Sequence, residues 1–487
     1  MHVQLRALAL RRPGTQTGTG NLSKATLGPD DRPRTLPLEC ATTWYCRAMA
    51  TNLRALIIAY AFPPVGGAGV QRTVKLAKYL REFDIEPAAL TVSNPSVPLE
   101  DTSMYSDFPD GMHVHRARTL EPRYSAKKAA WTAAAAERLS FRSRVRQSVI
   151  GLGRRALIPD PQLLWLPGAA FQLRQILGGA SRPDVVLISA PPFSQFLLVP
   201  LLRLIKRVGV VLDYRDEWST ARTTYEMLEG RLAAKGGELL ERAVVTQGHV
   251  ITTATEAFRD NLLRAIPRLS PKRVRVVTNG FDPDDFPVEI PAPPDDRFVV
   301  KYAGTIFKLT SARGLLGAVR RLHERDPILA KRLEVQFIGR VVDAEQATFE
   351  GMDKLGVRQV GYVAHSEVLS RLGSSHEVLC LLDDVRGVER IYPGKIFELM
   401  YLGRPILTLA PPGALERLVK RHELGVVIHP RDEVAIAEYL AKQIEAFRRG
   451  RHRSRERLQF HDTSRYHRRE LASLFADAMR AAHAMSR

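Results

Sequence analysis

One short stretch, RIYPGKIFELMYLGRPI at residues 390–406, limits the folds open to this chain more than any other. Pro393-Gly394 predicts a tight turn, no helix breaker follows before Gly403, and Arg404-Pro405 lead into the apolar run ILTLA at 406–410. This order predicts a loop, a short helix and a buried strand. The helix would direct free N–H groups and the positive end of its dipole toward an anion. An ordinary helix of an α/β domain, with Glu398 favouring the dipole, explains the same residues without a ligand.

The order of strand, loop and helix recurs along the chain. RALIIAY at 54–60 is an apolar run of strand length, a glycine loop follows it, and residues 72–83 have the apolar spacing of a helix. Such a unit opens a doubly wound sheet, although its loop lacks the GxGxxG fingerprint of dinucleotide binding. Further predicted strands, some with the loop that follows, lie at 88–92, 185–190, 208–218, 249–258, 274–286, 298–307, 333–340, 378–384 and 406–410.

A proline-rich segment divides the predicted elements into two sets. PAPPDDR at 291–297 is the clearest linker in the chain, and 487 residues are too many for one hydrophobic core. The aperiodic composition before Met49 predicts disorder, and Met49 is the expected native start. The predicted parts are, in order, a disordered arm at 1–48, an N-terminal domain at 49–290, a linker at 291–297, a C-terminal domain at 298–465 and a C-terminal helix at 466–487.

The formal net charge of +20 favours anionic partners, such as nucleotides, acidic lipid headgroups or nucleic acid. The segment 116–160 alternates basic with apolar residues and predicts a helical insertion that would lie on an anionic membrane. A solvated helical insertion has the same composition. Nucleic acid is not expected as a partner, because the basic residues are spread along the chain without RNA-binding aromatic motifs.

The cysteines and the apolar stretches favour a cytoplasmic protein, in peripheral contact at most with the inner face of the membrane. Three cysteines, Cys40, Cys46 and Cys380, provide neither a disulfide framework nor a metal cluster. The most apolar stretch, 185–205, is interrupted by prolines and polar residues, so it does not predict a transmembrane helix.

The strand predicted within 208–218 ends in a polar cluster of Asp213, Arg215, Asp216 and Trp218. In open α/β sheets the carboxyl ends of the strands face the ligand crevice, so this cluster is a candidate site. A structural ion pair between Asp213 and Arg215 would explain the cluster without any catalytic role.

Three motifs share their order and spacing with one enzyme family: Gly66-Gly67, Asn279-Gly280 and the stretch 390–406. They resemble the nucleotide-sugar glycosyltransferases of the GT-B fold, specifically the retaining family 4, from about residue 53 to the C-terminus. The resemblance implies an α/β fold of GT-B type, with two Rossmann-like doubly wound domains and a cleft between them. It also implies that a sugar passes, without a metal or other cofactor, from a UDP- or GDP-linked donor to a glycan or lipid-linked acceptor. Cell-surface polysaccharide or glycolipid biosynthesis is the expected setting.

The resemblance assigns roles to particular residues. Arg215 and Asp216 stand at a cleft loop where many relatives carry a histidine beside an acid, and they are the candidate catalytic residues. Glu398 matches the second glutamate of the family's E-x7-E motif, which binds the ribose hydroxyls, whereas Arg390 replaces the first and Glu389 lies one position away. The expected donor- and diphosphate-binding residues are Gly66, Gly67, Gly304, Lys308, Arg313, Gly394, Lys395 and Glu398. The expected nucleobase region is Gly339, Arg340, Tyr362 and Val363.

Other readings stay open at this point. A sugar-nucleotide 2-epimerase shares the fold, and a basic polyanion-binding protein would use the net charge alone. A metal site is not expected, because Asp282-Pro-Asp284 follows a turn, where helix capping explains the two acids better than metal binding.

Overall fold

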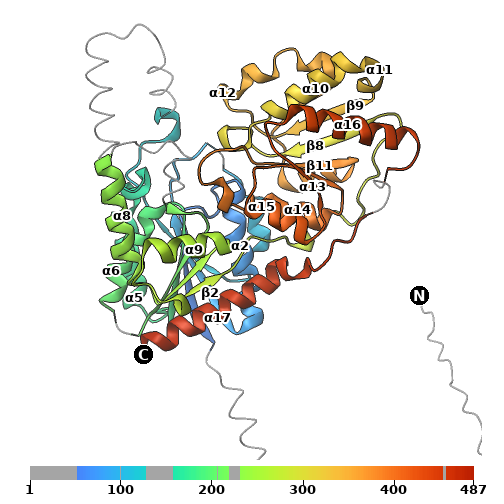
Figure 1. The fold of residues 1–487 in the computed structure, drawn as a ribbon. Coiled ribbons are helices and arrows are strands. Elements are labelled where there is room, and N and C mark those ends of the chain that lie inside the picture. Colours follow the sequence, from blue (N-terminus) through green and yellow to red (C-terminus); the bar gives the residue numbers. More distant parts are fainter. Residues whose placement is uncertain (1–51, 99, 128–156, 206, 219–230, 453–456) are drawn as a thin grey trace, which may run out of the picture. The chain divides into compact units, whose positions relative to one another are not determined.

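The computed structural model describes residues 52–98, 100–127, 157–205, 207–218, 231–452 and 457–487 (Figure 1). The chain divides into two compact units, Met1–Thr51 and Asn52–Arg487. The predicted arm at 1–48 and the expected start at Met49 lie outside the described residues. All further description concerns the second unit.

The first half of this unit forms a parallel sheet of 7 strands in the order β3-β2-β1-β4-β5-β6-β7. Its central strands are buried on both faces, which explains their continuous apolar sequences. The strands are β1 (Leu53–Ile58), β2 (Ile85–Val92), β3 (His113–Ala117), β4 (Val185–Ala190), β5 (Gly209–Tyr214), β6 (Val250–Thr253) and β7 (Val274–Val276). The helices of this half are α2 (Ala68–Leu80), α5 (Leu166–Gly178), α6 (Val199–Arg203), α8 (Arg231–Val245) and α9 (Glu256–Ala265).

The second half forms a parallel sheet of 6 strands in the order β10-β9-β8-β11-β12-β13, with its own hydrophobic core. The strands are β8 (Phe298–Ala303), β9 (Leu333–Ile338), β10 (Val357–Gly361), β11 (Glu377–Leu381), β12 (Ile406–Leu409) and β13 (Gly425–Ile428). The helices are α10 (Arg313–Arg325), α11 (Pro327–Ala330), α12 (Asp343–Gln346), α13 (His365–Gly373), α14 (Lys395–Leu402), α15 (Ala414–Arg421) and α16 (Glu433–Arg448).

The last helix, α17 (Arg468–Ser486), returns to the first sheet, where it packs on β4, β5, β6 and α2 (Figure 1). Its apolar face, which includes Phe475 and Met479, is part of the first hydrophobic core. Gly209 permits the close approach, because a Cβ atom there would lie 2.6 Å from the backbone nitrogen of His483. The C-terminal residues therefore complete the first half of the fold.

The strands predicted from apolar runs are confirmed in both sheets, and two predicted boundaries are wrong. Helix α2 begins at Ala68 rather than at Arg72, because Gly67 with φ 100° ends the preceding loop. The predicted helical insertion at 116–160 does not begin as a helix, since Arg116 pairs with Thr91 as part of the edge strand β3. Residues 128–156 of that segment lie outside the described residues. No helix in the described part of the chain combines the length and the apolar composition needed to cross a membrane.

Candidate functional site

The N-terminus of helix α14 is open, as the sequence predicted. Gly394 precedes the helix and is exposed, and no side chain among the described residues caps it. The helix ends at Gly403, whose φ of 72° fits the left-handed position that favours glycine. Uncapped N–H groups and the helix dipole therefore face outward from Gly394, where they can bind an anion.

Two glycines and a lysine meet beside this helix end. A Cβ atom on Gly304 would lie 3.2 Å from Nζ of Lys395, and one on Gly339 would lie 2.3 Å from the carbonyl oxygen of Gly304. Burial lowers the pKa of Lys395, and the negative charge of Glu398 opposes that effect. The loops after β8 and β9 therefore contact the first turn of α14. The backbone of these loops lies close to the ammonium group of Lys395.

The loop after β7 approaches the same helix end from the first half of the fold. A Cβ atom on Gly394 would lie 3.6 Å from Nδ2 of Asn279. Asn279 Oδ1 accepts a hydrogen bond from Arg72 at 3.3 Å, and the carbonyl of Thr278 accepts one at 2.6 Å. The structure therefore brings Asn279, Gly394, Lys395 and Gly304 together.

Further contacts join the two halves at Arg390. Its guanidinium pairs with Glu217 at 2.8 Å, and its carbonyl accepts a hydrogen bond from the Thr255 hydroxyl at 2.9 Å. It also contacts Glu389, whose carboxylate accepts a hydrogen bond from the amide of Gly387 at 2.9 Å. In this chain the position of the first motif glutamate is therefore occupied by a residue that bridges the two halves.

The polar cluster after β5 does not contain the Asp213–Arg215 ion pair that the sequence left open as an alternative. Asp213 pairs with Arg72, with Nη2 to Oδ1 at 2.7 Å and Nε to Oδ2 at 2.9 Å, so an Asp213–Arg215 ion pair is wrong. Arg215 instead donates to the carbonyls of Gly69 and Pro191. It therefore holds the first turn of α2, which follows Gly66 and Gly67, against the loop after β4.

Asp216, by contrast, is half-buried and forms no hydrogen bond or ion pair with any residue that the structure describes. Burial raises its pKa, although the positive charges of Arg215 and Arg72 oppose the rise. A carboxylate with a raised pKa and unused oxygens can accept a proton from a bound molecule.

The remaining predicted residues lie at the carboxyl edge of the second sheet, and they differ in their exposure and in their ion pairs. Lys308 and Arg340 are exposed, and no ion pair of either is found among the described residues. Arg313, by contrast, forms an ion pair, since its guanidinium lies 3.3 Å from the Glu345 carboxylate. Val363 is half-buried and Tyr362 is 58% exposed. Burial and the nearby charge of Asp101, a residue of the first half, raise the pKa of Tyr362.

Three acidic residues of the first half form a cluster that already contains a cation. Carboxylate oxygens of Asp107, Asp282 and Asp285 lie within 4.8 Å of one another. The ammonium of Lys75 lies 2.9, 2.9 and 2.5 Å from them, in the position that a metal ion would take. Asp282 also accepts a hydrogen bond from the amide of Asp284, which confirms the predicted capping. Burial opposes ionisation of Asp282, but hydrogen bonds from Lys78 and Lys75 lower its pKa overall.

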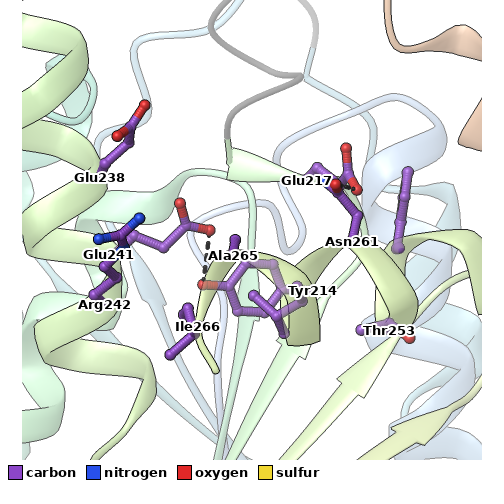
Figure 2. A pocket seen from close by; sticks show the side chains of 11 residues that line it. Tyr214, Glu217, Glu238, Glu241, Arg242, Thr253, Asn261, Ala265 and Ile266 are labelled. Atoms are coloured by element: carbon purple, nitrogen blue, oxygen red, sulfur yellow. Dashed lines mark hydrogen bonds between the residues drawn. The ribbon is translucent and has the colours of Figure 1, made fainter. Parts of the chain in front are cut away.

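An acid-lined pocket lies between α8 and α9, and it was not predicted from the sequence (Figure 2). Its volume is about 280 Å³, and Phe258 and Leu262 contribute apolar walls. Glu238, Glu241 and Arg242 come from α8, where Glu241 accepts a hydrogen bond from the Tyr214 hydroxyl at 3.3 Å. Spacings of three and four residues in α8 place these side chains on one face, a signal visible only once the helix is known. A second pocket, of about 400 Å³, includes Glu389 and Arg390.

The comparisons with known proteins agree with this architecture. Residues 66–280 match a protein family described as "Glycosyl transferase 4-like domain". The fold is similar to that of sucrose-phosphate synthase from Thermosynechococcus elongatus, with a TM-score of 0.57, 14% identity, and coverage of 89% of this chain and 100% of that chain. Anabaena HepE in complex with UDP and glucose has a TM-score of 0.55, 13% identity, and coverage of 88% and 99%. WaaG, a glycosyltransferase involved in lipopolysaccharide biosynthesis, has a TM-score of 0.55, 13% identity, and coverage of 87% and 99%.

No curated protein sequence matches the chain. The structural matches confirm the predicted fold class, which is GT-B with two Rossmann-like domains. The family match over the first domain and the GT-B fold together support transfer of a glycosyl group.

Proposed function

We propose that this protein is a retaining, metal-independent glycosyltransferase that moves a sugar from a UDP- or GDP-linked donor to a glycan or lipid-linked acceptor. One observation carries the proposal: Gly394, Lys395 and Gly304 surround an uncapped helix N-terminus that faces Asn279 of the first domain. A pyrophosphate would be stabilised there by fixed N–H groups and an ammonium group. The likeness to HepE, which was solved with UDP and glucose, supports a nucleotide-sugar donor.

The donor would extend along the carboxyl edge of the second sheet. Lys395, the N–H groups after Gly394 and the exposed Lys308 would neutralise the diphosphate, and Glu398 would accept hydrogen bonds from the ribose hydroxyls. Arg313 would take part only by exchanging its Glu345 partner. The nucleobase would lie near Gly339, Arg340, Tyr362 and Val363.

The acceptor would bind on the first domain, beside the loop that Arg215 fixes. As its hydroxyl oxygen bonds to the anomeric carbon, the bond from that carbon to the diphosphate breaks and the nucleoside diphosphate leaves. Asp216 would accept the hydroxyl proton, because its carboxylate has no partner among the described residues and its pKa is raised. Arg215 would act by holding the first turn of α2, directly after Gly66 and Gly67.

Cell-surface polysaccharide or glycolipid biosynthesis is the setting we propose, and the likeness to WaaG supports it. The proposal keeps the predicted cytoplasmic location at the inner face of the membrane. The basic segment expected to contact anionic lipid lies largely outside the described residues.

A thermal-shift panel of nucleoside diphosphates and their sugars tests donor binding. A ligand at 100 times its Kd stabilises the native state by roughly 2.7 kcal/mol, which raises Tm. We expect Glu398→Ala to remove the shift while the free protein keeps its fold. Glu445→Ala is the matched control, because among the described residues Glu445 pairs with Arg448 and Arg449 of its own helix region. An unchanged shift in Glu398→Ala would exclude Glu398 from the donor site.

The proton-acceptor role of Asp216 is tested by steady-state kinetics of Asp216→Asn with the exposed Asp110→Asn as the control. We expect kcat to fall by about 10² to 10⁴ in the first variant, with the donor-induced Tm shift unchanged. Full activity of Asp216→Asn would refute that role. Release of free UDP by the wild type without any acceptor would instead favour the 2-epimerase.

A further inference from the structure

One largely buried cation beside the candidate site has no hydrogen-bond or ion-pair partner for its side chain among the residues that the structure describes. Arg468 is the first residue of α17, and only 7% of it is exposed. The backbone nitrogen of Arg468 donates a hydrogen bond to the carbonyl of Phe281 at 2.8 Å. Phe281 is two positions after Asn279 in the chain, so this bond fixes Arg468 near the loop that carries Asn279. No hydrogen bond or ion pair of its guanidinium is found within the described ranges. Its side-chain nitrogens are not among the fully enclosed polar atoms that lack a partner, so they border space that an anionic acceptor can reach.

The neighbouring acids do not fill this role. Asp282 is already bound by Lys75 at 2.9 Å and Lys78 at 2.8 Å, and Asp285 is bound by Lys75 at 2.5 Å. These ammonium groups neutralise the two carboxylates that lie on this side of Arg468. The surroundings of Arg468 therefore contain less free negative charge than the number of acids suggests.

The other charges near Arg468 come from the candidate site itself. Burial and the positive charge of Arg72 lower the pKa of Arg468 to about 10, whereas the negative charge of Glu398 opposes the change. Glu398 lies in the first turns of α14, the helix whose N-terminus is uncapped. Tyr466, two residues before Arg468, packs on Phe397 of the same helix with ring centroids 4.9 Å apart. Arg468 thus belongs to the surroundings of the α14 N-terminus.

We propose that Arg468 binds the anionic oxygens of the ligand seated at the α14 N-terminus, together with Lys395. This inference rests on the proposed function, because the ligand that it assumes is the diphosphate of a nucleotide sugar. Arg468 belongs to the helix that packs on the first sheet, whereas Lys395 and Gly394 belong to the second domain. A diphosphate held by both therefore links the two domains, and the C-terminal helix takes part in donor binding.

Isothermal titration calorimetry with inorganic pyrophosphate and with UDP tests this inference. We expect Arg468→Met to weaken the binding of both by at least tenfold, and Arg468→Lys to restore part of the affinity because it keeps the charge. Arg469→Met is the matched control on the same helix, since Arg469 is exposed and pairs with Glu82. The Tm of ligand-free Arg468→Met should not fall, because the substitution removes a largely buried charge that no described residue neutralises by an ion pair.

The possible results separate the inference from the proposed function. If wild type and Arg468→Met bind UDP and pyrophosphate equally, the inference is wrong and the proposed function stands. A fall in the Tm of ligand-free Arg468→Met, without partial rescue of binding by Arg468→Lys, assigns Arg468 a purely structural role and also overturns the inference. Arg468-dependent binding of pyrophosphate without binding of any nucleotide supports the anion site and contradicts the proposed function. If the wild type binds neither pyrophosphate nor UDP, the inference and the proposed function are both wrong.

Discussion

The buried pair of Arg72 and Asp213 provides a quantitative test of how the first domain positions the candidate site. The two side chains are 3% and 1% exposed, and they come from α2 and β5. Asp213 also accepts hydrogen bonds from Ser189 at 2.7 Å and Thr252 at 2.8 Å, so both of its oxygens are fully used. Burial opposes its ionisation, but Arg72 and these hydroxyls keep its pKa below the ordinary value.

The perturbation is Asp213→Asn, which keeps the shape and removes the charge. It leaves the Arg72 guanidinium buried without a counter-ion, and breaking a buried pair in this way costs about 3–5 kcal/mol. We expect Arg72→Met to be costly as well, because Arg72 donates to the carbonyls of Val277 and Thr278 at 2.7 and 2.6 Å. The double variant should cost less than the sum of the single ones by roughly 0.5–3 kcal/mol, the range seen for residues in contact.

Urea unfolding followed by tryptophan fluorescence measures these free energies, since Trp165 and Trp218 are buried in the first core. The control is Glu86→Gln, because Glu86 forms an exposed pair with Arg81 at 2.6 Å, and such pairs contribute about 0–1 kcal/mol. The reasoning is refuted if Asp213→Asn costs no more than this control, or if the two single substitutions add without coupling.

Three further predictions concern other parts of the fold. Gly304 has φ 151° and a Cβ would lie 2.8 Å from the Tyr302 hydroxyl, so Gly304→Ala should lower the unfolding free energy by about 1–3 kcal/mol and weaken donor binding in calorimetry. Burial lowers the pKa of His376 from 6.5 to about 4, so the unfolded state binds the proton first and stability is lost as pH falls from about 6.5 to 4. His376→Asn, which keeps an acceptor for the Val299 amide, should flatten this loss in urea titrations at pH 7 and 5, and an unchanged slope would contradict the assignment. Burial raises the pKa of Cys380 to about 12, so in a variant with the other two cysteines replaced by serine this thiol should react with Ellman's reagent only after unfolding.

Local sequence patterns were sufficient to predict the secondary-structure elements of the fold. Apolar runs predicted the strands because a strand buried on both faces needs apolar residues throughout. The cap at Asp282 was predictable for a similar reason, since its side chain bonds to a backbone amide two residues away. The turn before α14 was equally local. The insertion at 116–160 was misjudged at its start because Arg116 occupies an edge strand, whose exposed side accepts charged residues.

The sequence by itself determined the two βα repeats, the glycine positions and the helix that begins after Gly394. Only the tertiary structure decided which charges surround that helix. Arg72 and Asp213 are 141 residues apart in the chain, and Arg390 meets Glu217 across 173. Arg468 reaches the site only because α17 returns to the first sheet. Pairings of this kind depend on strand order and on how helices pack across a sheet, and no local pattern of residue types contains that information.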